Sequence, residues 1–424
     1  SHTVTIDAKD KDDKVEVTLK DVNIDTSKQS KAAVSVTGSG DTTIELDGDN
    51  ELKSGAGHAG LEHNKTDTSG ELTIQDKDNN GSLEAAGGFK GAGIGSAGSN
   101  DAQVKITGGN ITATSDDWGA GIGSGSYGTG TVEITGGEIN ATGGYLGAGI
   151  GGGCNGSGNV TISGGTITAA GSDGAAGIGG GYYNGATVTI TGDAVIKNAS
   201  NTKYGAGIGG GNGSDGNVTI SGNAKIENAT GGYGAAGIGG GIFGLSNVTI
   251  EGNTKVNVTG GAGGAAIGGG AGAENNSDNN GNQITIKSNE NGSPTINAVG
   301  GGTDEGEKIV IGGAGIGAGC ESDADADITL EGKVTITATA GKDNVAIGAN
   351  GIEQEFSGLA EGSSITRYDS EGNDITLPTD PVPAVPSSSG GSSADASVQE
   401  SVFPGLVVTD KDGQRISYTS IRGN

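Results

Sequence analysis

Carboxylates are the side chains in this sequence best able to do acid–base chemistry. The chain has only three histidines and two cysteines, against 51 aspartates and glutamates. Asp116, Asp117 and Asp173 each stand shortly before a glycine-rich segment that contains the tripeptide GIG. Two carboxylates flanking a bound sugar are the working parts of most glycosidases. These three are therefore the candidate catalytic residues of a glycosidase or polysaccharide lyase, although aspartate is also a common turn former.

Alternating acidic residues offer two candidate calcium sites. Asp76, Asp78 and Asn80 precede a glycine in the manner of the first half of a calcium loop, but Gly87 stands where the last acidic ligand would be. A second run reads DADAD, and its carboxylates are Asp323, Asp325 and Asp327. Side chains at alternate positions of a strand share one face. Calcium is thus the cofactor we expect, and solvated turns are the alternative for both runs.

Aromatic residues, few in number, gather around the same glycine-rich segments. Most lie four or five residues before or after the isoleucine of a GIG tripeptide. Aromatic faces stack on sugar rings, and phenol groups hydrogen-bond to sugar hydroxyls. The candidate polysaccharide-binding residues are Trp118, Tyr127, Tyr145, Tyr182, Tyr183, Tyr204, Tyr233 and Phe243. The alternative is that these side chains cover the corners of a core, or that their surface docks a second molecule.

The glycine-rich segments themselves predict an unusual strand. In GAGIGGG, strict alternation would point Ala206 and Ile208 inward and Gly205, Gly207 and Gly209 outward. Glycine within a strand often marks the close approach of a ligand or of another backbone. We expect a bare glycine floor, edged by the aromatic side chains, on the outside of the molecule; a tight corner is the alternative reason for the glycines.

A repeat of about 28 to 30 residues must position all of these groups. The GIG isoleucines are Ile94, Ile122, Ile150, Ile178, Ile208, Ile238, Ile267, Ile316 and Ile347. Two further apolar columns keep the same phase, one through Val104, Val132 and Val160 and one through Ile111 and Ile139. Repeats of this length are typical of solenoids. Their Val, Thr, Ile and Gly content favours strands over helices.

We therefore predict an all-β fold, a right-handed parallel β-helix of three sheets and about 11 coils. Residues 1–60 are expected to form N-terminal capping coils, 61–350 the repeats and 351–376 a C-terminal cap. Residues 377–398 form a linker rich in Pro, Ser and Gly, and 399–424 begin a further module. Cys154 and Cys320 share one register but lie about five coils, ~24 Å, apart, so we expect no disulfide between them.

Charge and hydropathy exclude some partners. The net charge is −28, which disfavours binding to nucleic acid. The sequence has no apolar run long enough to cross a membrane, so we expect no membrane insertion. Other modules of the same polypeptide, reached through the linker, are the remaining expected partners.

The repeated unit VTISGGTITA…GAGIGGG, with the N-terminal VTLKDVNI…ELTIQ, resembles carbohydrate-binding β-helix surface proteins of gut Firmicutes. The resemblance covers roughly residues 15–350. It implies a secreted or cell-surface location, contact with a polysaccharide such as a host or plant glycan, and in some members calcium. The expected function is extracellular polysaccharide binding. A structural stalk or adhesin and a carboxylate-dependent glycosidase or lyase are the alternatives.

Overall fold

The structure is a computed structural model that describes residues 2–275, 281–304, 309 and 311–382. The chain divides into two units, residues 1–383 and 384–424. The second unit lies outside the described residues, as do most of the predicted linker and all of the predicted further module.

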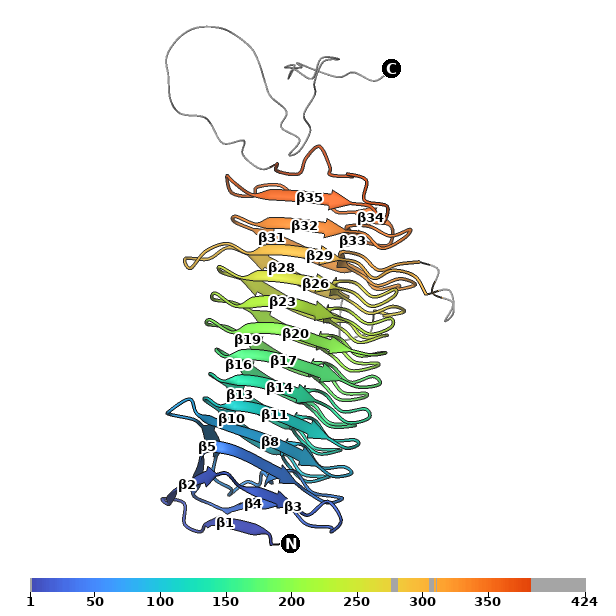
Figure 1. Cartoon of the computed structure of the whole chain (residues 1–424). Coiled ribbons are helices and arrows are strands. Elements are labelled where there is room, and N and C mark those ends of the chain that lie inside the picture. Colours follow the sequence, from blue (N-terminus) through green and yellow to red (C-terminus); the bar gives the residue numbers. More distant parts are fainter. Residues whose placement is uncertain (1, 276–280, 305–308, 310, 383–424) are drawn as a thin grey trace, which may run out of the picture. The chain divides into compact units, whose positions relative to one another are not determined.

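The first unit is built from coils that each add one strand to three parallel sheets, A, B and C (Figure 1). A short strand enters sheet A, the next strand enters sheet B, and a third enters sheet C before the chain returns to sheet A. Alternation of β-branched and small polar residues suits such strands, since one face packs inward. The predicted all-β parallel β-helix is confirmed.

The strands of sheet A are β1 (Val4–Ala8), β4 (Val34–Gly38), β6 (Leu61–His63), β9 (Ile94–Gly95), β12 (Ile122–Gly123), β15 (Ile150–Gly151), β18 (Ile178–Gly179), β21 (Ile208–Gly209), β24 (Ile238–Gly239), β27 (Ile267–Gly268), β30 (Ile316–Gly317), β33 (Ile347–Ala349) and β34 (Ile352–Glu353). Those of sheet B are β2 (Lys14–Lys20), the first part of β5 (Asp41–Lys53), β7 (Leu72–Gln75), β10 (Ala102–Ile106), β13 (Gly130–Ile134), β16 (Gly158–Ile162), β19 (Ala186–Ile190), β22 (Gly216–Ile220), β25 (Ser246–Glu251), β28 (Asn282–Lys287) and β31 (Ala326–Glu331). Those of sheet C are β3 (Asn23–Asp25), the second part of β5, β8 (Gly81–Gly87), β11 (Asn110–Ser115), β14 (Glu138–Thr142), β17 (Thr166–Gly171), β20 (Val195–Asn201), β23 (Lys225–Thr230), β26 (Lys255–Thr259), β29 (Thr295–Val299), β32 (Thr335–Thr339) and β35 (Ser364–Tyr368).

Sheet A sets the number of coils. Its strands follow one another in sequence order and end with β34, which pairs antiparallel to β33. The predicted count of about 11 coils began at Val34; β1 adds one more coil below it, with Val4 paired to Val34. No helix among the described residues is long and apolar enough to cross a membrane.

One apolar core runs through the coils. Ile122, Ile150 and Ile178 are consecutive partners in sheet A, and all three are fully buried. Val132 and Val160 stack in the same way in sheet B. Each buried aliphatic side chain contributes about 1.5–3 kcal/mol to folding. The winding of the chain around one axis therefore follows from the three in-phase columns.

The core ends at a buried cation. Arg367 of β35 pairs with Ala338 of β32, so it occupies a core position where the two preceding coils carry Ala338 and Ala298. Its Nε lies 2.7 Å from Asp380 Oδ2 and its Nη2 lies 2.9 Å from Asp380 Oδ1. Nη1 also donates to Glu353. Pairing with carboxylates offsets the cost of burying the guanidinium charge. This cluster closes the core at the last coil.

Candidate functional site

The glycine-rich strand of each coil is buried, which corrects the expectation of an exposed glycine floor. Gly205, Gly207 and Gly209 are all buried. A Cβ on Gly207 would lie 2.7 Å from the Gly237 carbonyl oxygen, and one on Gly209 would lie 2.1 Å from the Gly239 carbonyl oxygen. The glycines are present because neighbouring backbone comes too close for any side chain.

Two loops per coil cover this strand. In the coil of β15 the leading loop is 143–149 and the trailing loop is 152–157, one on each side of the strand. The Cys154 N–H in a trailing loop donates to the Trp118 carbonyl oxygen in the leading loop of the preceding coil, at 2.7 Å. The same bond is repeated along the molecule, between Ser126 and Lys90, Tyr182 and Leu146, Asn212 and Gly174, Ile242 and Tyr204, Ala271 and Gly234, and Cys320 and Gly263. The loops thus form a second backbone layer outside sheet A.

Each trailing loop turns at its fifth residue after the GIG isoleucine, here called the turn-tip residue. Tyr127, Tyr183 and Phe243 hold this position with φ of 66°, 57° and 64°. A left-handed backbone costs a bulky residue about 1–2 kcal/mol. The three residues are 57%, 59% and 60% exposed, so core burial does not offset that strain.

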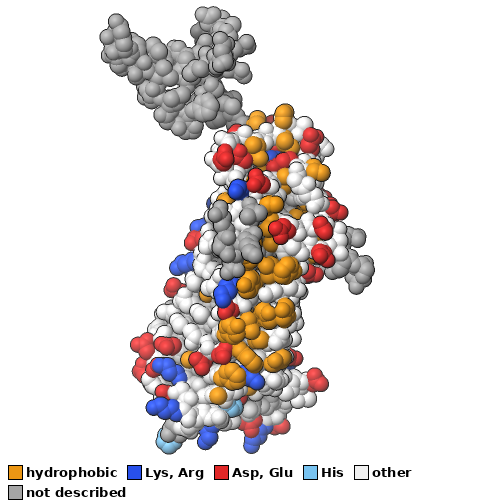
Figure 2. Space-filling view, turned by 90° about the vertical axis from the view of Figure 1, so that its right-hand side faces the viewer, with side chains coloured by type: hydrophobic (Ala, Val, Ile, Leu, Met, Phe, Trp, Pro, Cys, Tyr) orange, Lys and Arg blue, Asp and Glu red, His pale blue; other side chains and the backbone are white. Residues whose placement is uncertain are grey.

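Aromatic side chains recur as a stripe on the loops from coil to coil, and Figure 2 shows a row of hydrophobic patches on the loop side of the molecule. We call this stripe the aromatic ridge, and its members are Phe89, Trp118, Tyr127, Tyr145, Tyr182, Tyr183, Tyr204, Tyr233 and Phe243. The Phe89 and Trp118 ring centroids lie 5.2 Å apart, and the Lys90 ammonium lies 5.2 Å from the Trp118 centroid. The structure therefore places all eight predicted ligand-binding residues on the loops of one side, with Phe89 in addition.

Two members of the ridge also have a packing role. Tyr204 and Tyr233 lie 5.9 Å apart edge to face. Both pack against a small buried cluster that includes Ile242 and Cys320. The alternative interpretation, that the aromatics cover corners, thus fits these two tyrosines but not the exposed Tyr127, Tyr183 and Phe243.

Tyr182 and Tyr183 form the closest aromatic pair in the described part of the chain, with ring centroids 3.9 Å apart. Hydrogen bonding to Tyr183, followed by burial, raises the pKa of Tyr182 to about 12. The Tyr182 phenol therefore keeps its proton at neutral pH and can serve as a hydrogen-bond donor or acceptor.

The carboxylates predicted as catalytic lie on the leading loops beside the ridge. Asp116 is exposed, whereas Asp117 Oδ1 is buried without a hydrogen-bond partner. Burial, helped by the charge of Asp116, raises the pKa of Asp117. Asp173 Oδ1 is 2.8 Å from Lys203 Nζ. Asp173 thus carries a cation as partner, and Asp117 is the one of the three whose environment favours protonation.

The candidate calcium ligands serve the backbone or face solvent. Asp76 accepts the Asn80 and Gly81 N–H groups, one on each carboxylate oxygen, which makes it the cap of a turn. The carboxylates of the second run are exposed, and they are Asp323, Asp325 and Asp327. Among the described residues, no three His, Cys, Asp or Glu side chains are arranged to hold a metal ion.

The cysteines are free and buried, which confirms that Cys154 and Cys320 do not form a disulfide. Burial, followed by the nearby charge of Asp117, raises the pKa of Cys154. Burial, followed by the charge of Glu321, raises the pKa of Cys320 to about 11. Both residues follow a GIG isoleucine by four positions, where their N–H groups join the two loops.

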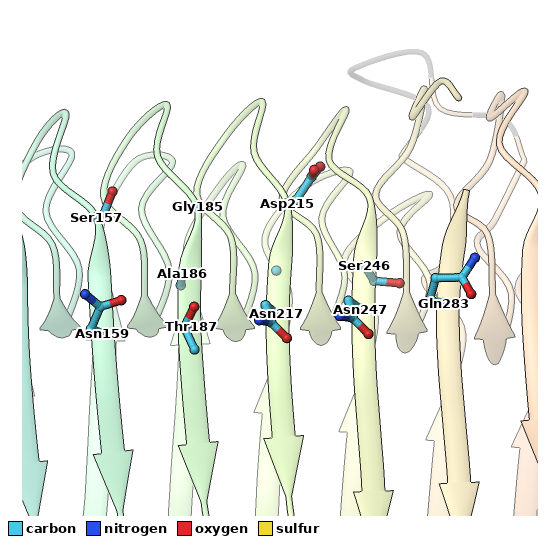
Figure 3. Close-up of a pocket in the computed structure, with 11 residues that line it drawn as sticks. Ser157, Asn159, Gly185, Ala186, Thr187, Asp215, Asn217, Ser246, Asn247 and Gln283 are labelled. Atoms are coloured by element: carbon cyan, nitrogen blue, oxygen red, sulfur yellow. The ribbon is translucent and has the colours of Figure 1, made fainter. Parts of the chain in front are cut away.

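Sequence reasoning missed a polar groove at the foot of the trailing loops (Figure 3). It has a volume of about 470 Å³. Its floor is one column of sheet B, in which consecutive partners are Asn159, Thr187, Asn217, Asn247 and Gln283. Ser157 and Asp215 stand above this column at the loops. The detectable signal was the polar residue that directly precedes the buried valine of each NVTI or TVTI motif.

Comparison with known proteins supports the fold. A family model described as a beta helix repeat matches residues 104–126, 132–154 and 160–182. These segments run from a strand of sheet B to the trailing loop of the next coil. No curated protein and no solved structure matches the chain.

Proposed function

We propose that this β-helix is an extracellular polysaccharide-binding protein and that the aromatic ridge is its binding surface. The observation that carries the proposal is the placement of Tyr127, Tyr183 and Phe243 at exposed turn tips with a left-handed backbone. Backbone strain of this kind concentrates at functional sites. Glycine at Gly213 and Gly272 fills the same turn position without strain.

The chemistry of the ridge fits a sugar polymer. Exposed rings supply apolar faces for the C–H side of pyranoses, and the phenols of Tyr182 and Tyr183 supply hydrogen bonds. Aromatic residues recur on the loops of successive coils from Phe89 to Phe243, as an extended ligand requires. The net charge of −28 opposes anionic polymers, so the proposal favours a neutral polysaccharide.

The stalk alternative explains less. A stalk needs the stacked coils and the closed loops, but it gains nothing from strained aromatic residues that are exposed to water. A carboxylate-dependent hydrolase or lyase would rest on Asp117, whose pKa is raised. Asp173, another of the three candidate carboxylates, is paired with Lys203. The side chains therefore favour binding over catalysis.

The test is a binding assay of the whole chain on a panel of neutral polysaccharides, by affinity electrophoresis and pull-down. The ridge variant combines Tyr127→Asn, Tyr183→Asn and Phe243→Asn, since Asn155 shows that asparagine fits the turn tip at φ 55°. Its matched control changes the polar groove instead, through Asn217→Ala and Asn247→Ala. The proposal expects retention to be lost in the ridge variant and kept in the groove variant, with similar melting temperatures.

Unchanged retention in the ridge variant would overturn the proposed surface, as would loss of retention in the groove variant alone. A parallel assay with a chelator tests the predicted calcium. Release of new reducing ends or unsaturated products, abolished by Asp117→Asn, would replace binding with catalysis.

A further inference from the structure

The turn-tip residues alternate along the molecule between aromatic and non-aromatic side chains. In coil order they are Ser99, Tyr127, Asn155, Tyr183, Gly213, Phe243, Gly272 and Glu321, and the alternation runs from Ser99 to Gly272. All have φ between 51° and 69°. An aromatic ring therefore recurs at every second coil, three times in succession, at one position of one turn.

Backbone hydrogen bonds hold these turns in one register. The Tyr127 N–H donates to the Cys154 carbonyl oxygen at 2.8 Å, and the Asn155 N–H donates to the Tyr182 carbonyl oxygen at 3.2 Å. The Phe243 N–H donates to the Ala271 carbonyl oxygen at 2.9 Å in the same way. The Tyr127 and Phe243 turns are thus bonded to the turns that follow them, and the Tyr183 turn is bonded to the Asn155 turn before it. The stacking of the coils sets the separation of the three rings.

Glycine at the following turn tip gives two of the rings, Tyr183 and Phe243, their room. A Cβ on Gly213 would lie 3.2 Å from Cδ1 of Tyr183, and one on Gly272 would lie 2.8 Å from Cδ1 of Phe243. Tyr183 and Phe243 therefore lean over the turn of the following coil. Each of these two rings lies over its own coil and the next one. The surface pattern therefore repeats every two coils, whereas the fold repeats every coil.

The two-coil repeat has a definite length. Neighbouring parallel strands are about 4.8 Å apart, so two coils rise about 9.6 Å and the three rings span about 19 Å. In an extended β-1,4-linked glycan, successive sugars are turned over, so every second sugar presents the same face at the length of one disaccharide. An α-1,4-linked glycan coils instead and does not present its faces in a straight row.

We infer that the ligand is an extended β-1,4-linked neutral glycan lying along the stacking axis, with every second sugar on one turn-tip ring. This inference rests on the proposed function and specifies its substrate class. Five consecutive sugars bring the first, third and fifth onto Tyr127, Tyr183 and Phe243. The non-aromatic turn tips at Asn155 and Gly213 face the sugars in between.

The first experiment measures binding of neutral β-1,4-linked oligosaccharides of two to six units to the whole chain by calorimetry, with maltohexaose as the α-1,4-linked control. The expected result is affinity that rises up to the pentasaccharide and then levels, with no detectable binding of maltohexaose. Equal binding of maltohexaose and the β-linked hexasaccharides would overturn the inference. So would affinity that shows no dependence on length.

The second experiment moves one ring without changing composition. A double variant, Tyr183→Asn with Asn155→Tyr, shifts the middle ring by one coil and breaks the two-coil repeat. It should lose affinity for the pentasaccharide as fully as Tyr183→Asn alone, about 2- to 12-fold for one aromatic contact, while its melting temperature stays near that of the parent.

The outcomes of that experiment separate this inference from the proposed function. Parental affinity in the shifted variant overturns the two-coil repeat but leaves polysaccharide binding on the ridge intact. Failure of the ridge variant to change retention of any polysaccharide overturns both.

Discussion

The Cys154 N–H donates to the Trp118 carbonyl oxygen at 2.7 Å, and this contact joins the trailing loop of one coil to the leading loop of the coil before it. Trp118 makes the contact with a left-handed backbone at φ 61°. Since the bond recurs from coil to coil, the loops form a regular layer that holds aromatic side chains at fixed positions. The proposed binding surface is thus part of the repeat.

Strain at the turn tips predicts that removing an exposed ring does not weaken the fold. Tyr127→Gly should leave the melting temperature unchanged or raise it, because glycine adopts φ 66° freely. The corresponding gain in the free energy of unfolding is at most about 1 kcal/mol. Thermal unfolding by circular dichroism measures this. Tyr127→Ala is the control, because it removes the ring but keeps the strained Cβ. A loss of more than about 1 kcal/mol for the glycine variant would assign the ring to packing.

Close backbone approach predicts that the buried glycines do not tolerate a methyl group. Gly207→Ala places a Cβ 2.7 Å from the Gly237 carbonyl oxygen, and we expect it to lower stability by about 1–3 kcal/mol or more. Gly302→Ala is the matched control, because a Cβ at Gly302 meets nothing within 4 Å. Equal melting temperatures for the two variants would contradict the buried position of the glycine strand.

Burial of His63 predicts a loss of stability in mild acid. Desolvation lowers the pKa of His63 below its ordinary value of 6.5, and its Nδ1 is buried without a hydrogen-bond partner. The unfolded chain therefore binds a proton at a higher pH than the folded chain does. The contribution of neutral His63 to the free energy of unfolding should be fully present above about pH 6.5. It should be lost as the pH falls from there toward the pKa of His63 in the folded chain.

Urea unfolding from pH 8 to pH 5 measures this dependence. His63→Asn should remove the component that titrates below about pH 6.5 while carboxylates continue to titrate at lower pH. An identical pH profile for parent and variant would exclude His63 as its source.

The cluster at the end of the core predicts that removing the cation of a buried ion pair costs much more stability than removing the cation of an exposed one. Arg367→Met leaves Asp380, which is itself buried, without its cation, and we expect a loss of about 3–5 kcal/mol. Lys20→Met is the control, since Lys20 pairs with Asp47 at the surface and should change stability by less than about 1 kcal/mol. Hydrogen exchange of β35 and β33 would localise the effect. A small, delocalised change for Arg367→Met would refute its role in closing the core.

The fold followed from the sequence because the information is periodic and local. Ile122, Ile150 and Ile178 recur at 28 residues, and the simplest way to bury such columns together is to wind once per repeat. The same periodicity placed the aromatics beside the GIG strand and the two cysteines too far apart to bond. These properties depend on spacing along the chain, which the sequence contains in full.

Exposure was decided by the tertiary structure, because it depends on contacts between coils. Alternation alone assigned Gly207 to an outer face, whereas the loops of neighbouring coils bond across that face and bury it. The same contacts partly bury Tyr204 against the cluster of Ile242 and leave Tyr183 in solvent. Spacing determined which residues share a column; only the packing of backbone from separate coils determined which columns reach the water.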